Sequence, residues 1–286
     1  MKELNTNMKA NHPLNIIIMC FSLLIVTICC GRNINKKDVI EIEWCKIPAG
    51  SFLMGRSTGE RETCEEPLHQ VYLNEFFISK YEVTVSLYER FCDETGRKKP
   101  NKHYYDSNEY PIDDVSWNEA IDFCHWISQK NGYTISLPTE AQWEKAARGG
   151  TVGENYVYES DDLLVEGRTA HPTELLEQYE WFGFNSGGDI HVVGGKKPNP
   201  YGLYDILGNV SEWCFDLYDN DYYKKGDKYN PKGPKWNDSG CRVIRGGDFS
   251  NDNKALRCSY RRAAMPDFKG VGFRLVKLGS SGAKEK

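Results

Sequence analysis

Oxygen-bearing groups are concentrated between residues 205 and 212 of the chain. A hard cation such as calcium takes several oxygen ligands at about 2.3–2.6 Å, from both carboxylates and backbone carbonyls. This segment has a carboxylate at each end, and its small residues can turn carbonyls inward. The alternative is that Glu212 only pairs with a core arginine such as Arg245 or Arg274. We predict a structural calcium site whose ligands are Asp205, Gly208, Val210 and Glu212.

Ten cysteines are a second source of chemistry. Three of them, at positions 20, 29 and 30, fall in an apolar N-terminal run. No two cysteines have the Cys-x-x-Cys spacing, which argues against a thiolate zinc site. An odd number is left, so at least one thiol stays unpaired even where disulfides form. These remaining cysteines are Cys45, Cys64, Cys92, Cys124, Cys214, Cys241 and Cys258.

Other polar patterns give weaker evidence for a metal or nucleic-acid site. Asp216, Asp219 and Asp221 are spaced like metal ligands, but no glycine follows at the position that a calcium-binding loop of the EF-hand type requires. We interpret them as a solvated acidic loop. The net charge of −5 leaves no basic stripe to neutralise phosphates, so nucleic acid is not an expected partner.

The helices and strands that must position these residues are predicted most clearly in the first half of the chain. Apolar spacing predicts a helix that begins near residue 83 and stops at Gly96. Ser116 and Glu119 form a capping box that starts a second helix, and Thr139 caps a third. Residues 41–55 predict two short strands around a turn, and residues 69–81 predict a hairpin. After Gly150 regular patterns fade, so we expect one α+β domain over residues 41–278 with little regular structure.

The N-terminus resembles a bacterial lipoprotein signal. Residues 16–30 are too short for the ~20 apolar residues of a comfortable membrane span, and lysines precede them as in a secretory leader. The run ends in Cys29-Cys30-Gly31, where the resemblance implies a lipidated cysteine. We predict a signal peptide at 1–30, lipidation at Cys30 (with Cys29 as the alternative), and a cell-envelope location, with the outer membrane or cell surface favoured. A polar tether at 31–40 and a polar tail at 279–286 complete the chain, and an uncleaved signal anchor is the alternative to the lipid anchor.

Seven motifs together resemble the family of sulfatase-modifying-factor, or formylglycine-generating-enzyme-like, domains. The resemblance implies the irregular C-type-lectin-like fold, and the predicted calcium ligands match the family's calcium site position by position. Serine replaces the tryptophan that is common at position 211. The motifs are IPAGSFLMG at 47–55, KYEVT at 80–84, VSWNEA at 115–120, LPTEAQWEKAARGG at 137–150, YGLYDILGNVSEW at 201–213, RVIRGG at 242–247 and GFR at 272–274.

The catalytic residues of this family are not matched. Its enzymes oxidise a substrate cysteine to formylglycine with copper held by two cysteines five residues apart, and soft thiolates suit Cu(I). Asn251 and Leu256 stand at those positions here. Cys258 lies two residues out of register, so we interpret it as a core cysteine or a disulfide partner of Cys214 rather than a copper ligand. Copper is therefore not an expected cofactor.

The expected function is that of a lipid-anchored binding module whose partner is an envelope protein or glycan. In ligand-binding members of the family, the segment after Arg-Gly-Gly is the exposed recognition surface. An alternative is a formylglycine-generating oxidase, or a related oxidoreductase, with rearranged ligands. A purely structural subunit of an envelope complex is a third possibility. The predicted binding residues are Asp248, Phe249, Ser250, Asn251, Asp252 and Asn253.

Overall fold

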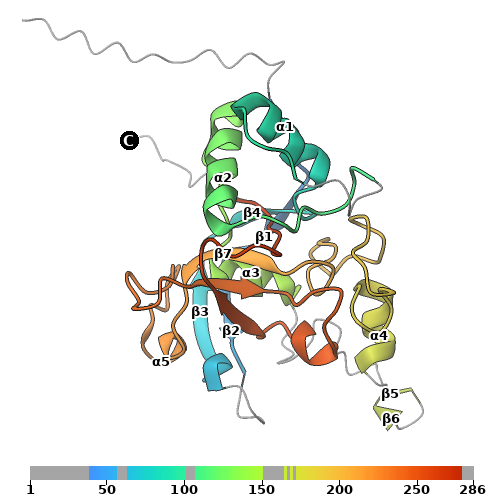
Figure 1. Cartoon of the computed structure of the whole chain (residues 1–286). Helices are drawn as coiled ribbons and strands as arrows, with labels where there is room; N and C mark the ends of the chain where they lie inside the picture. Colours follow the sequence, from blue (N-terminus) through green and yellow to red (C-terminus); the bar gives the residue numbers. More distant parts are fainter. Residues whose placement is uncertain are drawn as a thin grey trace, which may run out of the picture. The chain divides into compact units, whose positions relative to one another are not determined.

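The computed structural model describes residues 39–56, 63–100, 107–150, 164–165, 168–169 and 172–278 (Figure 1). The predicted signal peptide with Cys30, nearly all of the tether and the polar tail lie outside these residues. No helix in the described part of the chain has the length and apolar character needed to cross a membrane.

Two small antiparallel sheets organise the first half of the domain. Strand β4 (Phe76–Ser79) lies between β1 (Trp44–Ile47) and β10 (Val276–Leu278). The first and last strands of the domain therefore belong to the same sheet. Strand β2 (Gly50–Met54) pairs separately with β3 (His69–Leu73).

The predicted hairpin at residues 69–81 is wrong, because β3 and β4 belong to different sheets. The physical reason is that both edges of β3 are already occupied. One edge bonds to β2, and on the other Tyr72 N donates to Lys228 O at 2.7 Å while Tyr72 O accepts from Asn230 N at 2.8 Å.

The three predicted helices are confirmed with their caps. Helix α1 (Val85–Thr95) ends at Gly96 in the left-handed conformation. Helix α2 (Trp117–Asn131) starts with the complete Ser116–Glu119 capping box and packs against α1. Helix α3 (Glu140–Ala147) starts with a second capping box, made by Thr139 and Gln142. Local hydrogen bonding thus fixes where each helix begins.

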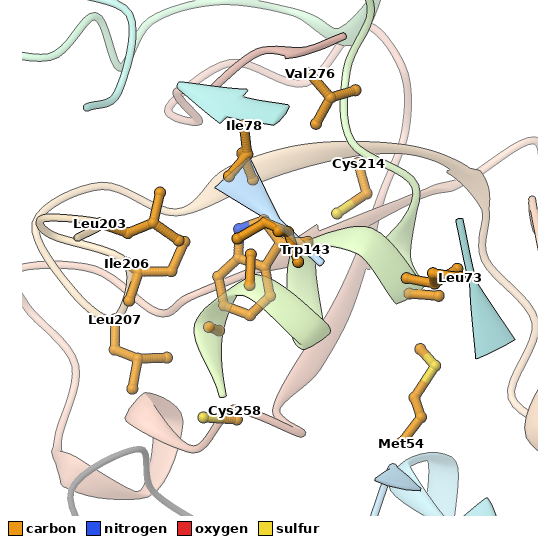
Figure 2. Packing of buried hydrophobic residues seen from close by; sticks show 14 of the residues in the cluster. Met54, Leu73, Ile78, Trp143, Leu203, Ile206, Leu207, Cys214, Cys258 and Val276 are labelled. Carbon is orange, nitrogen blue, oxygen red and sulfur yellow. The ribbon is translucent and has the colours of Figure 1, made fainter. Parts of the chain in front are cut away.

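Helix α3 is the centre of the domain, since all of its residues are buried. The ring of Trp143 lies in a core cluster with residues from widely separated parts of the chain, including Leu73, Leu203, Leu207 and Val276 (Figure 2). A second cluster forms between α1, α2 and the segment around Phe273. Stacked and edge-on aromatic contacts join Phe123 to Tyr88, Phe91 and Phe273 in that cluster.

The second half carries a third sheet in the order β7-β8-β9. The observed architecture is an α+β domain with few regular elements, as predicted. Its remaining elements are short. They are β7 (Glu212–Leu217), β8 (Arg242–Arg245), β9 (Arg261–Ala264), β5 (Leu164–Val165), β6 (Arg168–Thr169), α4 (Pro172–Tyr179), α5 (Tyr222–Lys225) and the 3₁₀ turns η1 (Thr63–Glu65) and η4 (Asn253–Leu256).

Two expectations about individual residues are wrong. Asp216 is not part of a solvated loop: it lies on β7, is only 2% exposed, and accepts from Glu140 N at 2.8 Å. For Cys258 the disulfide alternative is wrong and the core alternative is confirmed: Cys258 is buried in the core cluster, it is not paired with Cys214, and every cysteine in the described residues is a free thiol. Figure 2 places Cys214 and Cys258 at separate points around the Trp143 ring.

Candidate binding site

The carboxylate of Glu212 is held by two buried partners at the start of β7. Arg274 Nη2 lies 2.7 Å from Glu212 Oε1, and Arg274 Nε lies 2.8 Å from both oxygens. Trp143 Nε1 donates to Oε2 at 2.8 Å. Glu212 therefore forms the ion pair with Arg274, whereas Arg245 pairs with Glu144.

Asp205 has an unused oxygen in the same region. Its Oδ2 accepts from Gly194 N at 2.7 Å, whereas its Oδ1 is buried without a hydrogen-bond partner. Burial raises the pKa of Asp205 to about 6. Glu82 lies nearby and accepts from Asn209 Nδ2 and Val210 N. Burial, followed by repulsion from the Asp205 and Glu212 carboxylates, raises the pKa of Glu82 well above its ordinary value.

The predicted calcium ligands therefore fit in part. Asp205 offers a buried carboxylate oxygen that lacks a partner, which is the condition expected of a cation ligand. Glu212 has less capacity to bind a cation, because its two carboxylate oxygens already accept hydrogen bonds from Arg274 and, at Oε2, from Trp143. In the described residues, no group of three or more His, Cys, Asp or Glu side chains could hold a metal ion.

The backbone between Asp205 and Glu212 has a conformation that few residues tolerate. Gly208 has a φ of 105°, and a Cβ there would lie 2.3 Å from Trp181 O. Asn209 N donates to the same carbonyl at 2.7 Å. The Leu-Gly-Asn sequence is thus needed for close packing against the segment after α4, whether or not an ion is bound.

The loop that follows β8 is held by Asp248 and Ser211. Asp248 Oδ1 accepts from Ser250 N at 3.0 Å, which makes a local turn. The Ser211 hydroxyl donates to Gly247 O at 3.0 Å and accepts from Arg262 Nη2 at 2.8 Å. The serine that replaces the family's tryptophan therefore ties this loop to β9.

A cavity of about 370 Å³ opens beside this loop. Phe184 is 70% exposed and lies 6.4 Å from Phe182 between ring centroids, with the two rings nearly parallel. The cavity thus has an aromatic wall and a polar wall of hydroxyl, amide and carboxylate groups. Its lining residues are Phe182, Gly183, Phe184, Ser250, Asn251, Asp252 and Asn253.

The two walls are fixed to each other by backbone contacts. Gly183 N donates to Asn251 O at 2.8 Å, and Ser186 Oγ donates to Phe249 O at 2.8 Å. A Cβ at Gly183 would lie 2.8 Å from Asn251 O, so only glycine allows this approach. Four of the six predicted binding residues line the cavity, while Asp248 and Phe249 support it. Sequence reasoning missed the aromatic wall, because no periodic or motif signal links residues 182–184 to residues 250–253.

The two residues that were matched to the family's copper positions lie in different environments. Asn251 lines the cavity, whereas Leu256 is fully buried in the core cluster. Cys258 is 1% exposed, and burial raises the pKa of its thiol to about 12. The thiolate is the form that binds metals and attacks substrates, so Cys258 remains a protonated core thiol near neutral pH.

The fold and this loop define a C-type-lectin-like domain of the formylglycine-generating-enzyme type. The chain belongs to the family of sulfatase-modifying factor enzyme 1-like domains, whose family model matches residues 35–278.

Similar proteins show how widely this domain is used. The formylglycine-generating enzyme of Streptomyces coelicolor is 28% identical over 285 residues, which cover 80% of this chain and 87% of that protein. The serine/threonine-protein kinase pkn1 of Chlamydia pneumoniae is 31% identical over 266 residues, or 85% of this chain. The chain spans only 39% of that kinase's length. The structure of PvdO from Pseudomonas aeruginosa has a TM-score of 0.72 and 26% identity, covering 82% of this chain and 94% of that one.

Proposed function

We propose that this chain is a non-catalytic, ligand-binding member of its family, exported and anchored in the bacterial envelope through a lipid on Cys30. The observation that carries the proposal is the state of the copper positions. An amide at Asn251 and a buried aliphatic side chain at Leu256 replace the two thiolates that the family's oxidation chemistry uses, and soft thiolates are what select Cu(I).

The cavity beside the loop is the binding site under this proposal. Its contacts between Gly183 and Asn251 and between Ser186 and Phe249 keep it formed without a ligand. Ligand sites are commonly preformed hollows with aromatic walls and a few polar groups that fix orientation. A ligand with one apolar face and a hydrogen-bonding edge fits this arrangement, as a glycan or a protein loop of the envelope would.

Calcium is proposed as a structural cofactor, with Asp205 as its principal carboxylate ligand and the carbonyls of Gly208 and Val210 beside it. A bound calcium ion supplies positive charge near three buried carboxylates, those of Glu82, Asp205 and Glu212. Its role is to stabilise the segment that precedes β7, and no chemical step depends on it.

A binding assay with paired phenylalanine variants tests the proposed site. The full chain in detergent is screened against panels of envelope glycans and envelope-derived peptides. We expect a ligand whose binding is lost in Phe184→Ala and kept in Phe268→Ala, a matched control that is 51% exposed and outside the cavity. Equal binding by both variants would exclude the cavity as the site.

A second candidate, the oxidase with rearranged ligands, keeps one supporting observation: the 28% identity to the Streptomyces coelicolor enzyme over most of both chains. It requires Cys258 to ionise in the core, and the raised pKa of that thiol opposes this.

A further inference from the structure

Two sulfur atoms meet where strand β8 begins and strand β9 ends. Arg242 of β8 is paired with Ala264 of β9, so Cys241 and Met265 are opposite each other one step further along the two chains. Cys241 Sγ lies 3.6 Å from Met265 Sδ, with the thiol donating toward the thioether. Met265 is 51% exposed and Cys241 is partly exposed, so both sulfurs can be reached from solvent.

Hydrogen bonds hold the backbone of both residues in this pair. Cys241 O accepts from Tyr218 N at 2.9 Å and from Asn237 Nδ2 at 3.2 Å. Met265 O accepts from Phe268 N at 2.9 Å. The pair therefore lies on backbone that is hydrogen-bonded where β8 begins and β9 ends, which reduces the entropy lost when both side chains hold one ligand.

A thiolate and a thioether are soft ligands that favour Cu(I) over hard cations. With metal–sulfur bonds of about 2.3 Å, as zinc makes to cysteine, a trigonal angle of ~120° places two sulfurs about 4 Å apart. The observed 3.6 Å separation is a few tenths of an ångström shorter, a difference that small side-chain rotations can supply.

We propose that Cys241 and Met265 form a surface site for a soft monovalent cation, Cu(I), or Ag(I) as its analogue. On binding, the Cys241 thiol loses to solvent the proton that it directs at Met265, and the metal bonds to both sulfurs. No electron is transferred. A solvent molecule or an external ligand completes the coordination, because the described residues provide no group of three His, Cys, Asp or Glu ligands.

This site is independent of the proposed ligand-binding function. Its cysteine is partly exposed, whereas Cys258 is buried in the core. Copper bound at Cys241 would therefore account for copper on the protein without any contribution from Cys258.

Competition titration with a colorimetric Cu(I) chelator tests the proposal on the reduced full chain, with Cys20, Cys29 and Cys30 replaced by serine. We expect one tightly bound Cu(I) per chain, and its loss in Cys241→Ser. Met265→Leu keeps the apolar volume of the side chain and should weaken binding by about tenfold or more, the scale on which metal sites respond to lost support. Circular dichroism checks that each variant is folded.

Cys64→Ser is the matched control, since Cys64 is another partly exposed free thiol in the described residues. It should bind Cu(I) like the parent chain. Unchanged affinity in Met265→Leu would overturn the proposal, because binding would then belong to a single thiol. Loss of binding in Cys64→Ser or Cys258→Ser would place the metal elsewhere and overturn it equally.

Discussion

The guanidinium of Arg274 holds the carboxylate of Glu212 by two nitrogens, at 2.7 and 2.8 Å, in a site where neither side chain is exposed. The same guanidinium donates to Tyr204 O at 3.1 Å. One arginine near the end of the chain thereby fixes the start of β7 and the preceding segment, which carries Asp205. Arg274 also donates to the backbone carbonyl of Asp205 itself, at 3.3 Å.

Removing one partner of the Arg274–Glu212 pair should lower the stability of the fold. Arg274→Met leaves the Glu212 carboxylate buried with only Trp143 Nε1 as a side-chain donor, so the free energy of unfolding should fall by about 3–5 kcal/mol. Urea denaturation measures the change. The double variant Arg274→Met/Glu212→Leu removes both charges and should recover part of the loss. A double variant less stable than Arg274→Met would contradict this account.

Stability should also fall as pH rises because of Asp216. Burial, followed by the nearby Glu140 carboxylate, raises the pKa of Asp216 from 3.8 to about 8. The folded state therefore binds a proton more tightly than the unfolded state does. This contribution is fully present below pH 3.8 and is lost as pH rises through about 8.

The variant Asp216→Asn tests this dependence, because its amide oxygen can still accept from Glu140 N. The free energy of unfolding, measured by urea from pH 4 to pH 9, should depend less on pH in the variant than in the parent chain. Parallel curves for the two proteins would show that Asp216 does not titrate in this range.

Calcium should raise the melting temperature through Asp205. At a free calcium concentration of about 100 times the dissociation constant, binding to the folded state alone adds roughly 2.7 kcal/mol. The increase should disappear with a chelator and in Asp205→Asn. Asp252→Asn, which changes an exposed carboxylate, serves as the control and should respond like the parent chain. A melting temperature that does not change with calcium would exclude calcium as a structural cofactor of this chain.

Lipid attachment should require a single cysteine. Cells that express the full chain and are fed labelled palmitate should label the parent chain and Cys29→Ser, but not Cys30→Ser. Membrane fractionation should show the same difference. Labelling that persists in Cys30→Ser and is lost in Cys29→Ser would move the anchor by one residue, and absence of label in all three would exclude a lipoprotein.

Sequence reasoning succeeded where structure is determined by neighbouring residues. The Ser116–Glu119 box and the left-handed Gly96 are local devices, and both form as predicted. It failed where distant segments decide the outcome. The strand at 69–73 takes its partners from residues 50–54 and 228–230, and Asp216 is buried by packing against α3.

The candidate binding site likewise combines a part that the sequence predicts with a part that only the fold shows. The loop at residues 248–253 was predictable because it follows a recognisable Arg-Gly-Gly motif. Phe184 was not, since it is brought to the loop by contacts between segments far apart in the sequence, from Gly183 N to Asn251 O and from Ser186 Oγ to Phe249 O. Spacing alone matches Asn251 and Leu256 to the family's copper positions, and the fold adds that Leu256 lies in the core and Asn251 on the cavity wall.

The most direct test of the central claim is turnover of a peptide that carries the sulfatase cysteine motif. The copper-loaded full chain is incubated with the peptide in air, and the products are analysed by mass spectrometry, with a formylglycine-generating enzyme as the positive control. The account predicts unmodified peptide, because a protonated core thiol and an asparagine cannot replace the thiolate pair. Formation of formylglycine that is lost in Cys258→Ser would contradict it and identify this chain as an oxidase.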